Sequence, residues 1–413
     1  VGLASILMCS MLGGMRAVTW TQVAQYIVLI IAYLLPVFWI SNNIGAGFFP
    51  HFMLADEVAR IAELEGQFGF VKNSAADLAT VPKGLAGITK PHSSVNATPW
   101  AFISLAVCMM AGTASLPHVM MRYFTTPSVK SARRSVGWSL FFIFLLYSSA
   151  PMLATLSKIS LMDPNLATGI IGKSITEVQA LDWYQNWNQA KLMFVSDFNG
   201  NGTLELNEFF MKGSAVVLAT PEIAGLPYVI SGLVAAGGMA AAMSTADGLV
   251  LAISNALSHD VYYKIINPKA ETAKRLIVAR VLLVLIGFAG ATIAALEIQG
   301  ILGSVIWAFD FAMSGLFFPL VLGVWWKRAN APGAVAGMLL GLISGTAYLV
   351  WVRSGGSGFL GITQLTFGIV GASVSLVSMI VVSLITAAPD AATQKMVDDV
   401  RIPSGKTILG KQH

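Results

Sequence analysis

The sequence contains few charged residues for its length. Of its 413 residues only 11% are Asp, Glu, Lys or Arg, whereas 56% are hydrophobic, and the mean hydropathy is +0.73. Soluble globular chains carry roughly a quarter charged residues, so this shortage predicts an integral membrane protein with the lipid bilayer as partner. The net charge of +5 is small and dispersed, which excludes a nucleic-acid-binding surface.

Cysteine is scarce, and no catalytic arrangement is recognisable. Cys9 and Cys108 lie in apolar runs without metal-type spacing and are expected to be small hydrophobic residues. No nucleophile, base and oxyanion pattern occurs, so we expect no enzyme. The opening stretch VGLASILMCSMLGGM lacks an initiator Met and a basic segment, so we interpret it as the tail of a membrane helix in a fragment.

Long apolar runs predict an all-α chain that crosses the membrane repeatedly. A window of about 19 residues places one partial span at 1–14 and complete spans at 21–41, 99–121, 136–157, 223–253, 275–296, 300–325, 333–352 and 362–387. Residues 1–388 would form this membrane region and 389–413 a tail.

Basic residues gather in alternate connections between the spans, for example at Arg133, Lys274 and Arg328. The positive-inside rule therefore places these ends, and the C-terminal tail, in the cytoplasm. The long polar connections 42–98 and 158–222 would face the outside. The first contains FMLADEVARIAELEGQF, which predicts an amphipathic helix on the outer surface with Glu63 and Glu65 in solvent.

One span carries an unusual group of oxygen-bearing side chains. In MAAAMSTADGL, a helix would place Ala241, Ser244 and Thr245 on one face, with Asp247 about 60° from Ser244. Hydroxyls and freed carbonyls are ligands for a hard cation, and an ionisable group within a span is a functional candidate. The alternative is that both hydroxyls bond only to carbonyls of their own helix. The spacing alone favours this alternative, whereas the nearby Asp247 favours a functional site.

A second span is interrupted. CMMAGTASLPHVMMRYF places Gly112, Thr113, Ser115 and Pro117 in mid-span, which predicts a broken helix of the kind that exposes backbone polar groups in transporters. Asp310, in SVIWAFDFAMSG, is a second acid within a span. It could be functional or could lie near a helix end, and the sequence favours neither reading.

The stretch AAAMSTADGLVLAISNALSHDVYYK resembles the eighth core helix of the sodium/solute symporters. GGMRAVTWTQVAQ and GTASLPHVMMRYFT resemble two further markers of that family, in the expected order. The resemblance implies the inverted-repeat, leucine-transporter-type helix bundle with alternating access, here from the fourth core helix onward. It implies a secondary active transporter in which sodium entry drives uptake of a small organic solute.

The resemblance also implies site residues. Sodium would bind the carbonyl of Ala241 and the hydroxyls of Ser244 and Thr245. Solute contacts would come from the broken helix, at Met109, Gly112, Thr113 and Ser115. This sequence departs from the family at Gln22, where an acid often follows the Trp-Thr pair, so any role of that acid in cation release is in doubt here.

The stretch VVLATPEIAGLPYVISGLVAAGGMAAAMSTADG is most similar to the acetate/glycolate-type permeases, which implies a short monocarboxylate and a bacterial inner membrane. A symporter for proline or another small solute remains an alternative. So does a membrane sensor or calcium-regulated module on the same bundle, although the short tail after residue 388 has no room for a signalling domain.

The outer connection contains DFNGNGTLELNE, at 197–208, which matches an EF-hand calcium loop. The ligands would be Asp197, Asn199, Asn201, the carbonyl of Thr203, Glu205 through water, and Glu208 in bidentate fashion. With three acidic ligands in a single copy, we expect weak binding, roughly 10⁻⁵ to 10⁻³ M. The alternative is a turn rich in Asn and Gly before a short helix.

Overall fold

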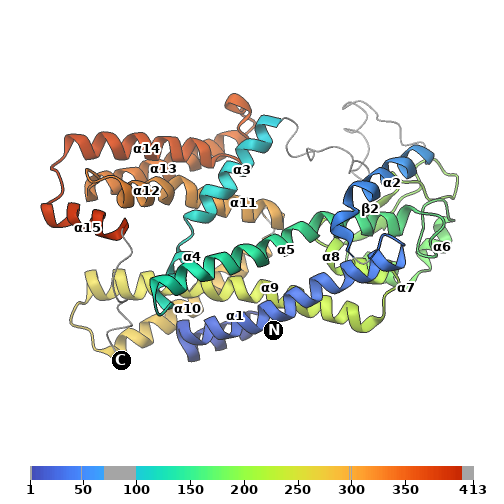
Figure 1. The fold of residues 1–413 in the computed structure, drawn as a ribbon, viewed down its shortest axis with the longest axis horizontal. Helices are drawn as coiled ribbons and strands as arrows, with labels where there is room; N and C mark the ends of the chain where they lie inside the picture. Colours follow the sequence, from blue (N-terminus) through green and yellow to red (C-terminus); the bar gives the residue numbers. More distant parts are fainter. Residues whose placement is uncertain (1, 48, 69–98, 297, 299, 402–413) are drawn as a thin grey trace. The chain divides into compact units, whose positions relative to one another are not determined.

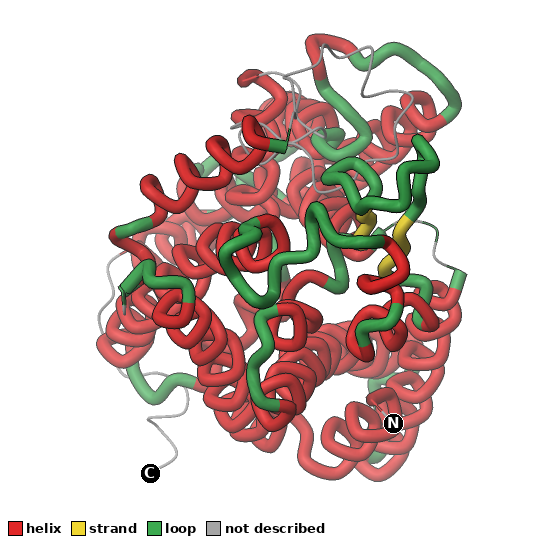
Figure 2. The backbone as a smooth tube through the Cα atoms, turned by 90° about the vertical axis from the view of Figure 1, so that its right-hand side faces the viewer, coloured by secondary structure: helices red, strands yellow, loops and turns green. Residues whose placement is uncertain are grey.

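The computed structural model describes residues 2–47, 49–68, 99–296, 298 and 300–401. The described chain is almost entirely helical, with one pair of short strands (Figures 1 and 2). The predicted all-α class is therefore confirmed. Residues 69–98 of the predicted outer connection and 402–413 of the predicted tail lie outside the described residues.

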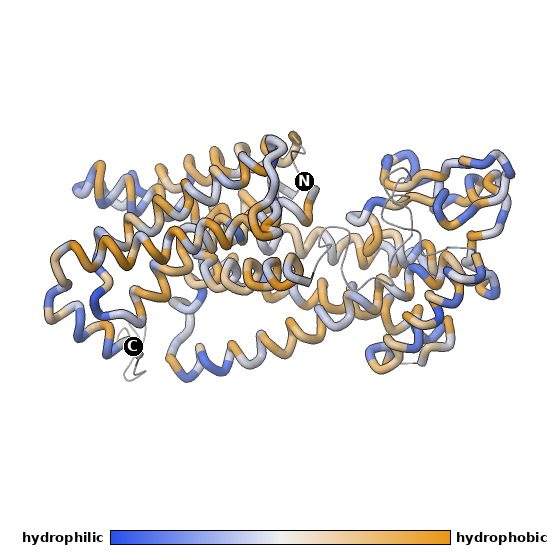
Figure 3. The backbone as a smooth tube through the Cα atoms, turned by 90° about the horizontal axis from the view of Figure 1, so that it is seen from above, coloured by the Kyte–Doolittle hydropathy of each residue, from blue (hydrophilic) through white to orange (hydrophobic). Residues whose placement is uncertain are grey.

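Each complete span predicted from hydropathy corresponds to a helix. In the described part of the chain, 7 helices are long and apolar enough to cross a membrane, or up to 8 if a bent pair counts as one span. They are Ala17–Asn43, Val129–Met162, Tyr228–Ile266, Thr272–Ala295, Ile301–Trp325, Ala331–Arg353 and Gly368–Ile385, with the bent pair Trp100–Ala114 and Pro117–Tyr123. Figure 3 shows the long helices mainly in hydrophobic colours and their connections mainly in hydrophilic ones.

The chain divides into two compact units. The first comprises residues 1–91 and 137–251, and the second comprises residues 92–136 and 252–413. The first unit holds α1 (Gly2–Asn43), η1 (Pro50–Phe52), α2 (Leu54–Gln67), most of α5 (Val129–Met162), α6 (Ile175–Gln179), α7 (Asp182–Gln189), β1 (Met193–Val195), β2 (Phe209–Met211), α8 (Val216–Ile223) and most of α9 (Tyr228–Asn255).

The helix α1 consists of two arms that meet at Gly14. This glycine has φ 56° and ψ −157°, a non-helical conformation that L-residues with a Cβ rarely adopt. Both arms contact α9, because Ser10 lies before the break and bonds to Asp247, while Gln22 lies after it and bonds to Ser244. The break therefore lets one stretch of sequence supply two neighbours to the same part of α9.

The connection between α5 and α9 packs around an apolar core that also includes Leu64 of α2. Strands β1 and β2 pair antiparallel with Phe194 opposite Phe210, whose rings stack with centroids 4.5 Å apart. Fully buried side chains beneath them include Ile170, Val178 and Phe209. The sequence predicted a polar outer connection here, and hydropathy gave no sign of this core.

The second unit holds the remaining helices. They are α3 (Pro99–Ala114), α4 (Pro117–Met120), η3 (Met121–Thr125), the π-helix η4 (Ala256–Ile266), α10 (Thr272–Ala295), α11 (Ile301–Ala312), the π-helix η5 (Met313–Phe317), α12 (Phe318–Trp325), α13 (Ala331–Arg353), η6 (Phe359–Gly361), α14 (Gly368–Ile385) and α15 (Ala391–Arg401).

Helices α13 and α14 lie side by side (Figure 1) and approach closely along a row of glycines. Gly333, Gly337, Gly341 and Gly345 recur every fourth residue and are all buried. A Cβ on Gly341 would lie 2.1 Å from the carbonyl oxygen of Ser314, so only glycine fits there. Small residues at this spacing are the usual means by which membrane helices pack without bulky side chains between them.

Candidate functional site

Three oxygens converge on one face of α9. The Ser244 hydroxyl donates to the Ala241 carbonyl at 2.9 Å, and the Thr245 hydroxyl lies 3.5 Å from the same oxygen. Ser244 is half-buried and Thr245 is exposed. The three predicted sodium ligands thus lie together on α9. Both hydroxyls bond to a carbonyl of their own helix, which is also the geometry expected if they bind no ion.

Neighbouring polar groups come from the two arms of α1. The buried Gln22 donates from Nε2 to the Ser244 carbonyl at 2.6 Å, so Ser244 uses both its hydroxyl and its carbonyl. Asp247 has no exposed surface, and its Oδ1 accepts a long bond of 3.4 Å from the Ser10 hydroxyl. Its Oδ2 has no hydrogen-bond partner among the described residues. The predicted acid of this helix is therefore buried beside the hydroxyl pair.

An apolar cavity of about 380 Å³ reaches Ala241 within the first unit. Its walls come from α1, α5, α8 and α9, and the lining residues are Leu29, Ala32, Tyr33, Leu146, Tyr147, Ala150, Val217, Val234, Gly237, Gly238 and Ala241. Clefts of this size accommodate small ligands or single side chains. Ala241, one of the three candidate cation ligands, thus lies in the wall of this apolar cavity.

The broken helix is present where the sequence predicted it. The segments Trp100–Ala114 and Pro117–Tyr123 meet at an angle of 47°. Pro117 begins the second segment, and the Ser115 amide bonds to the Gly112 carbonyl at 3.0 Å in a tightened last turn. The prediction from the Gly, Thr, Ser and Pro pattern is confirmed.

The four predicted solute-contact residues differ in their surroundings. Met109 is half-buried and Thr113 is exposed, with its hydroxyl bonded to the Met109 carbonyl at 2.6 Å. Ser115 has no exposed surface and bonds to the Ala111 carbonyl. Gly112 is also buried. Thr113 and Met109 therefore offer accessible surface, whereas Gly112 and Ser115 contribute packing that shapes the break.

The sodium:solute symporter family matches residues 1–174 and 212–341. The chain belongs to this family. An uncharacterised symporter of Cupriavidus necator is 33% identical over 488 aligned positions, which cover 97% of this chain and 70% of the relative. A monocarboxylic acid transporter of Corynebacterium glutamicum is 26% identical over 353 positions, covering 83% of this chain and 54% of the relative.

The chain resembles a solved structure with a TM-score of 0.57. That structure is a sodium-coupled sialic acid symporter in a substrate-bound, outward-open state. The identity is 16%, and the likeness covers 93% of this chain and 66% of that one. It confirms the leucine-transporter-type fold. The chain thus spans about two thirds of the sialic acid symporter and about half of the monocarboxylic acid transporter. The family and these relatives are transporters, which confirms the prediction of no enzyme and supports sodium-coupled solute uptake.

The stretch between residues 174 and 212 falls outside the family match and contains the predicted calcium loop. Asp197 accepts hydrogen bonds from the backbone amides of Gly200 and Gly202, at 2.8 and 3.0 Å. Both glycines have a φ of 72°, so the loop turns in the left-handed region at two points. The loop closes the hairpin between β1 and β2.

The other acids of the loop are bonded as well. Glu208 is 1% exposed and accepts from the amides of Phe198 and Glu205, at 2.9 and 3.0 Å. The Glu205 carboxylate accepts from the side-chain amides of Asn199 and Asn201. Across the described chain, no three His, Cys, Asp or Glu side chains converge as a metal site. The oxygens of the motif therefore gather in one loop and hold it together through hydrogen bonds.

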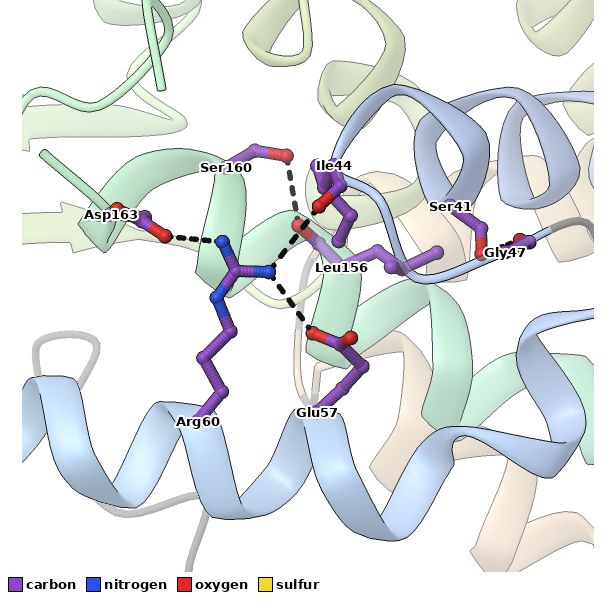
Figure 4. Close-up of polar contacts among 8 residues, drawn as sticks. All are labelled: Ser41, Ile44, Gly47, Glu57, Arg60, Leu156, Ser160 and Asp163. Carbon is purple, nitrogen blue, oxygen red and sulfur yellow. Dashed lines mark hydrogen bonds and ion pairs between the residues drawn. The ribbon is translucent and has the colours of Figure 1, made fainter. Parts of the chain in front are cut away.

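A network of ion pairs joins α2 to the end of α5 (Figure 4). Arg60 of α2 bonds to Asp163 and also contacts Glu57, at 3.4 Å. Burial raises the pKa of Asp163, but the backbone amide of Asn165 and the Arg60 guanidinium lower it more, so the net pKa lies below its ordinary value. Helix α2 is thus fixed to the end of α5 by charge.

A second ion pair between α2 and α5 shows that the prediction of a solvent-exposed Glu65 is wrong. Glu65 is 5% exposed and accepts a bond of 2.6 Å from Lys158, which is 2% exposed. Sequence reasoning read α2 as a helix with a solvated polar face and missed this partner. A signal existed, because a lysine within an apolar span, as in LATLSKISLM, is rare and implies a buried partner.

Proposed function

We propose that this chain couples sodium entry to the uptake of a small organic solute, by alternating access across a bacterial inner membrane, with its C-terminus in the cytoplasm. The observation that carries the proposal is the convergence of the Ala241 carbonyl with the Ser244 and Thr245 hydroxyls on α9. Family membership supports the same activity, and the 7 long apolar helices in the described part of the chain support the membrane setting.

These oxygens suit a monovalent cation. A hydroxyl carries two acceptor lone pairs besides its proton, so it can coordinate a cation while it donates to a carbonyl. Neutral oxygens coordinate the ion without adding net negative charge to the bilayer interior. Gln22 holds the Ser244 carbonyl from the other side, which fixes the turn that presents the hydroxyls.

For the solute we propose a short monocarboxylate such as acetate or glycolate. The relative from Corynebacterium glutamicum, a monocarboxylic acid transporter, supports this choice. In this chain the exposed Thr113 hydroxyl and the half-buried Met109 at the break would provide one polar and one apolar contact. Proline uptake, and a sensor that reports solute without moving it, are the outcomes that would replace this proposal.

The test is uptake of labelled acetate, glycolate and proline by cells that express the gene, with sodium exchanged for potassium. We expect sodium-dependent uptake of a monocarboxylate. Thr245→Ala should raise the sodium concentration for half-maximal uptake by about tenfold or more, because it removes one of the oxygens that coordinate the charged sodium ion. Thr292→Ala is the matched control, since Thr292 is exposed and bonds to the Phe288 carbonyl four residues earlier on α10. An equal sodium requirement in both variants contradicts the site.

A second candidate function concerns the loop at 197–208. We propose that it binds calcium weakly and stiffens the outer connection. Its support is the full set of ligand-type residues within one loop and the two left-handed glycines. Calcium would replace the side-chain amides of Asn199 and Asn201 as the partner of the Glu205 carboxylate. Calcium should slow proteolysis within 190–215 in the parent chain, whereas magnesium and the Glu208→Gln variant should not show this protection. Cleavage that ignores calcium would dismiss the idea.

A further inference from the structure

Asp310 is a fully buried acid within a helix that can cross a membrane. It lies near the end of α11, directly before the π-helix η5, in the candidate span Ile301–Trp325. Its side chain has no exposed surface, and neither carboxylate oxygen makes a contact of full hydrogen-bond geometry among the described residues. A buried acid without a cation partner costs a few kcal/mol and requires a physical reason.

Its surroundings are mostly apolar, with a few weak donors. The Cys108 thiol of α3 faces the carboxylate, as do the backbone amides of Phe367 and Gly368 at the start of α14. The fit is close, because a Cβ on Gly368 would lie 2.8 Å from Oδ1 of Asp310. Cys108 is the titratable group that faces Asp310, and no charged side chain of α3, α11, η5, α13 or α14 lies beside it among the described residues.

These surroundings act on the carboxyl group in opposite directions. Apolar burial favours the neutral acid, whereas amides at a helix N-terminus and a thiol donor favour the carboxylate. No cation pairs with the acid among the described residues, and weak donors face it, so each protonation state has a neighbour that stabilises it. We propose that Asp310 is a proton-binding site that takes up a proton from water and releases it again during the transport cycle.

The site is linked to the broken helix within the second unit. Gly112 is pressed against the residue before Asp310, since a Cβ on it would lie 2.5 Å from the Phe309 carbonyl oxygen. Ser314 of η5 donates to the Asp310 carbonyl at 2.7 Å. An ionised carboxylate can accept a hydrogen bond from the Cys108 thiol, whereas a protonated acid carries a proton of its own. Protonation therefore changes the contact that joins α3 to α11 and α14.

The proton can be observed without replacing Asp310. The sequence has 2 cysteines, so the Cys9→Ala protein retains Cys108 as a single thiol. We expect its infrared S–H stretching band to shift as pH is varied, and to lose that shift in Cys9→Ala/Asp310→Asn. Asp260→Asn, which removes an exposed acid, is the matched control and should retain the shift. A band that does not change with pH, or a shift that persists without Asp310, overturns the proposal.

A second variant covers the case in which Asp310→Asn does not fold. Asp310→Glu keeps the acid but moves it by one methylene, so the midpoint of the S–H shift should change. An unchanged midpoint means that another group titrates, and this result also overturns the proposal.

The role in transport rests on the proposed function, so it is measured separately. In reconstituted protein, the initial rate of solute uptake should vary with pH, and Asp310→Asn should abolish that variation. If the parent protein takes up none of the tested solutes, the proposed function fails while the S–H titration still decides whether Asp310 binds a proton. If Asp310 titrates and the variant keeps the parent pH profile, a role in the transport cycle is refuted.

Discussion

The buried pair of Lys158 and Glu65 permits a quantitative test of the contact between α2 and α5. The Lys158 amine lies 2.6 Å from the Glu65 carboxylate. Counting side-chain atoms alone, Lys158 is 2% exposed and Glu65 is 7% exposed. Removal of one partner leaves the other charge buried, which typically costs about 3 to 5 kcal/mol. We therefore expect Lys158→Met to lower the thermal stability of the purified protein strongly and to expose α2 to protease.

The double variant separates a charge effect from a packing effect. Replacement of both partners by apolar residues of similar volume is often neutral or stabilising, so Lys158→Met/Glu65→Leu should recover most of the lost stability. The matched control is Lys173→Met. Its pair with Glu177 has a separation of 3.9 Å and exposures of 39% and 60%, for which we expect less than about 1 kcal/mol.

The assay is thermal unfolding in detergent, with limited proteolysis of α2 as a local readout. The reasoning is refuted if Lys158→Met melts with the parent protein, or if the double variant is as unstable as the sum of the two single variants. The first result would mean that the amine reaches solvent. The second would mean that shape rather than charge holds α2 to α5.

Three further predictions concern other parts of the chain. Gly341→Leu should abolish folding or lower stability markedly in a melting assay, because the added Cβ would meet the Ser314 carbonyl at 2.1 Å. The lowered pKa of Asp163 means that its contribution to stability is complete above the unfolded value of about 3.9 and is lost as pH falls through the lower folded value. Gln22→Leu should change the sodium dependence of uptake, because it removes the bond of 2.6 Å to the Ser244 carbonyl.

Each of these predictions has its own control. Gly290→Ala places a methyl group in open space on α10 and should be neutral or stabilising, so an equal loss in both glycine variants would contradict the packing argument. The acid-induced loss of stability should be shallower in Asp163→Asn, and identical slopes would exclude this carboxylate as its source. An unaltered sodium requirement in Gln22→Leu would show that this amide does not shape the cation site.

The membrane helices could be predicted because lipid imposes a simple rule on sequence. Every spanning backbone must satisfy its own hydrogen bonds, so a long apolar run has one stable form. The break at Pro117 was also predictable, since proline lacks the amide that a continuous helix needs. Both features are local, and neither depends on the identity of a distant residue.

The connection between α5 and α9, and its contact with α2, could not be predicted in the same way, because their stability comes from contacts between distant residues. Lys158 and Glu65 are separated by 93 positions, and neither residue reveals its partner through spacing. The core around Phe209 likewise draws on short helices and strands whose apolar residues have no long periodicity. Hydropathy averaged over a long window reports such a region as polar, even though it is packed.

Polar residues within spans differ in how strongly they indicate a functional site. The difference depends on whether the polar group finds a hydrogen-bond partner within its own helix. A serine or threonine that bonds to a carbonyl three or four residues earlier loses little in lipid, so its presence alone does not indicate a ligand. The Ser244 and Thr245 hydroxyls have that geometry, and only an ion-dependent measurement distinguishes a cation site from simple back-bonding there. Asp247 and Asp310 have no such internal partner. Each is fully buried, with at least one carboxylate oxygen that has no hydrogen-bond partner among the described residues. Such an acid is costly in lipid, so it is a stronger functional candidate than a hydroxyl that bonds to its own helix.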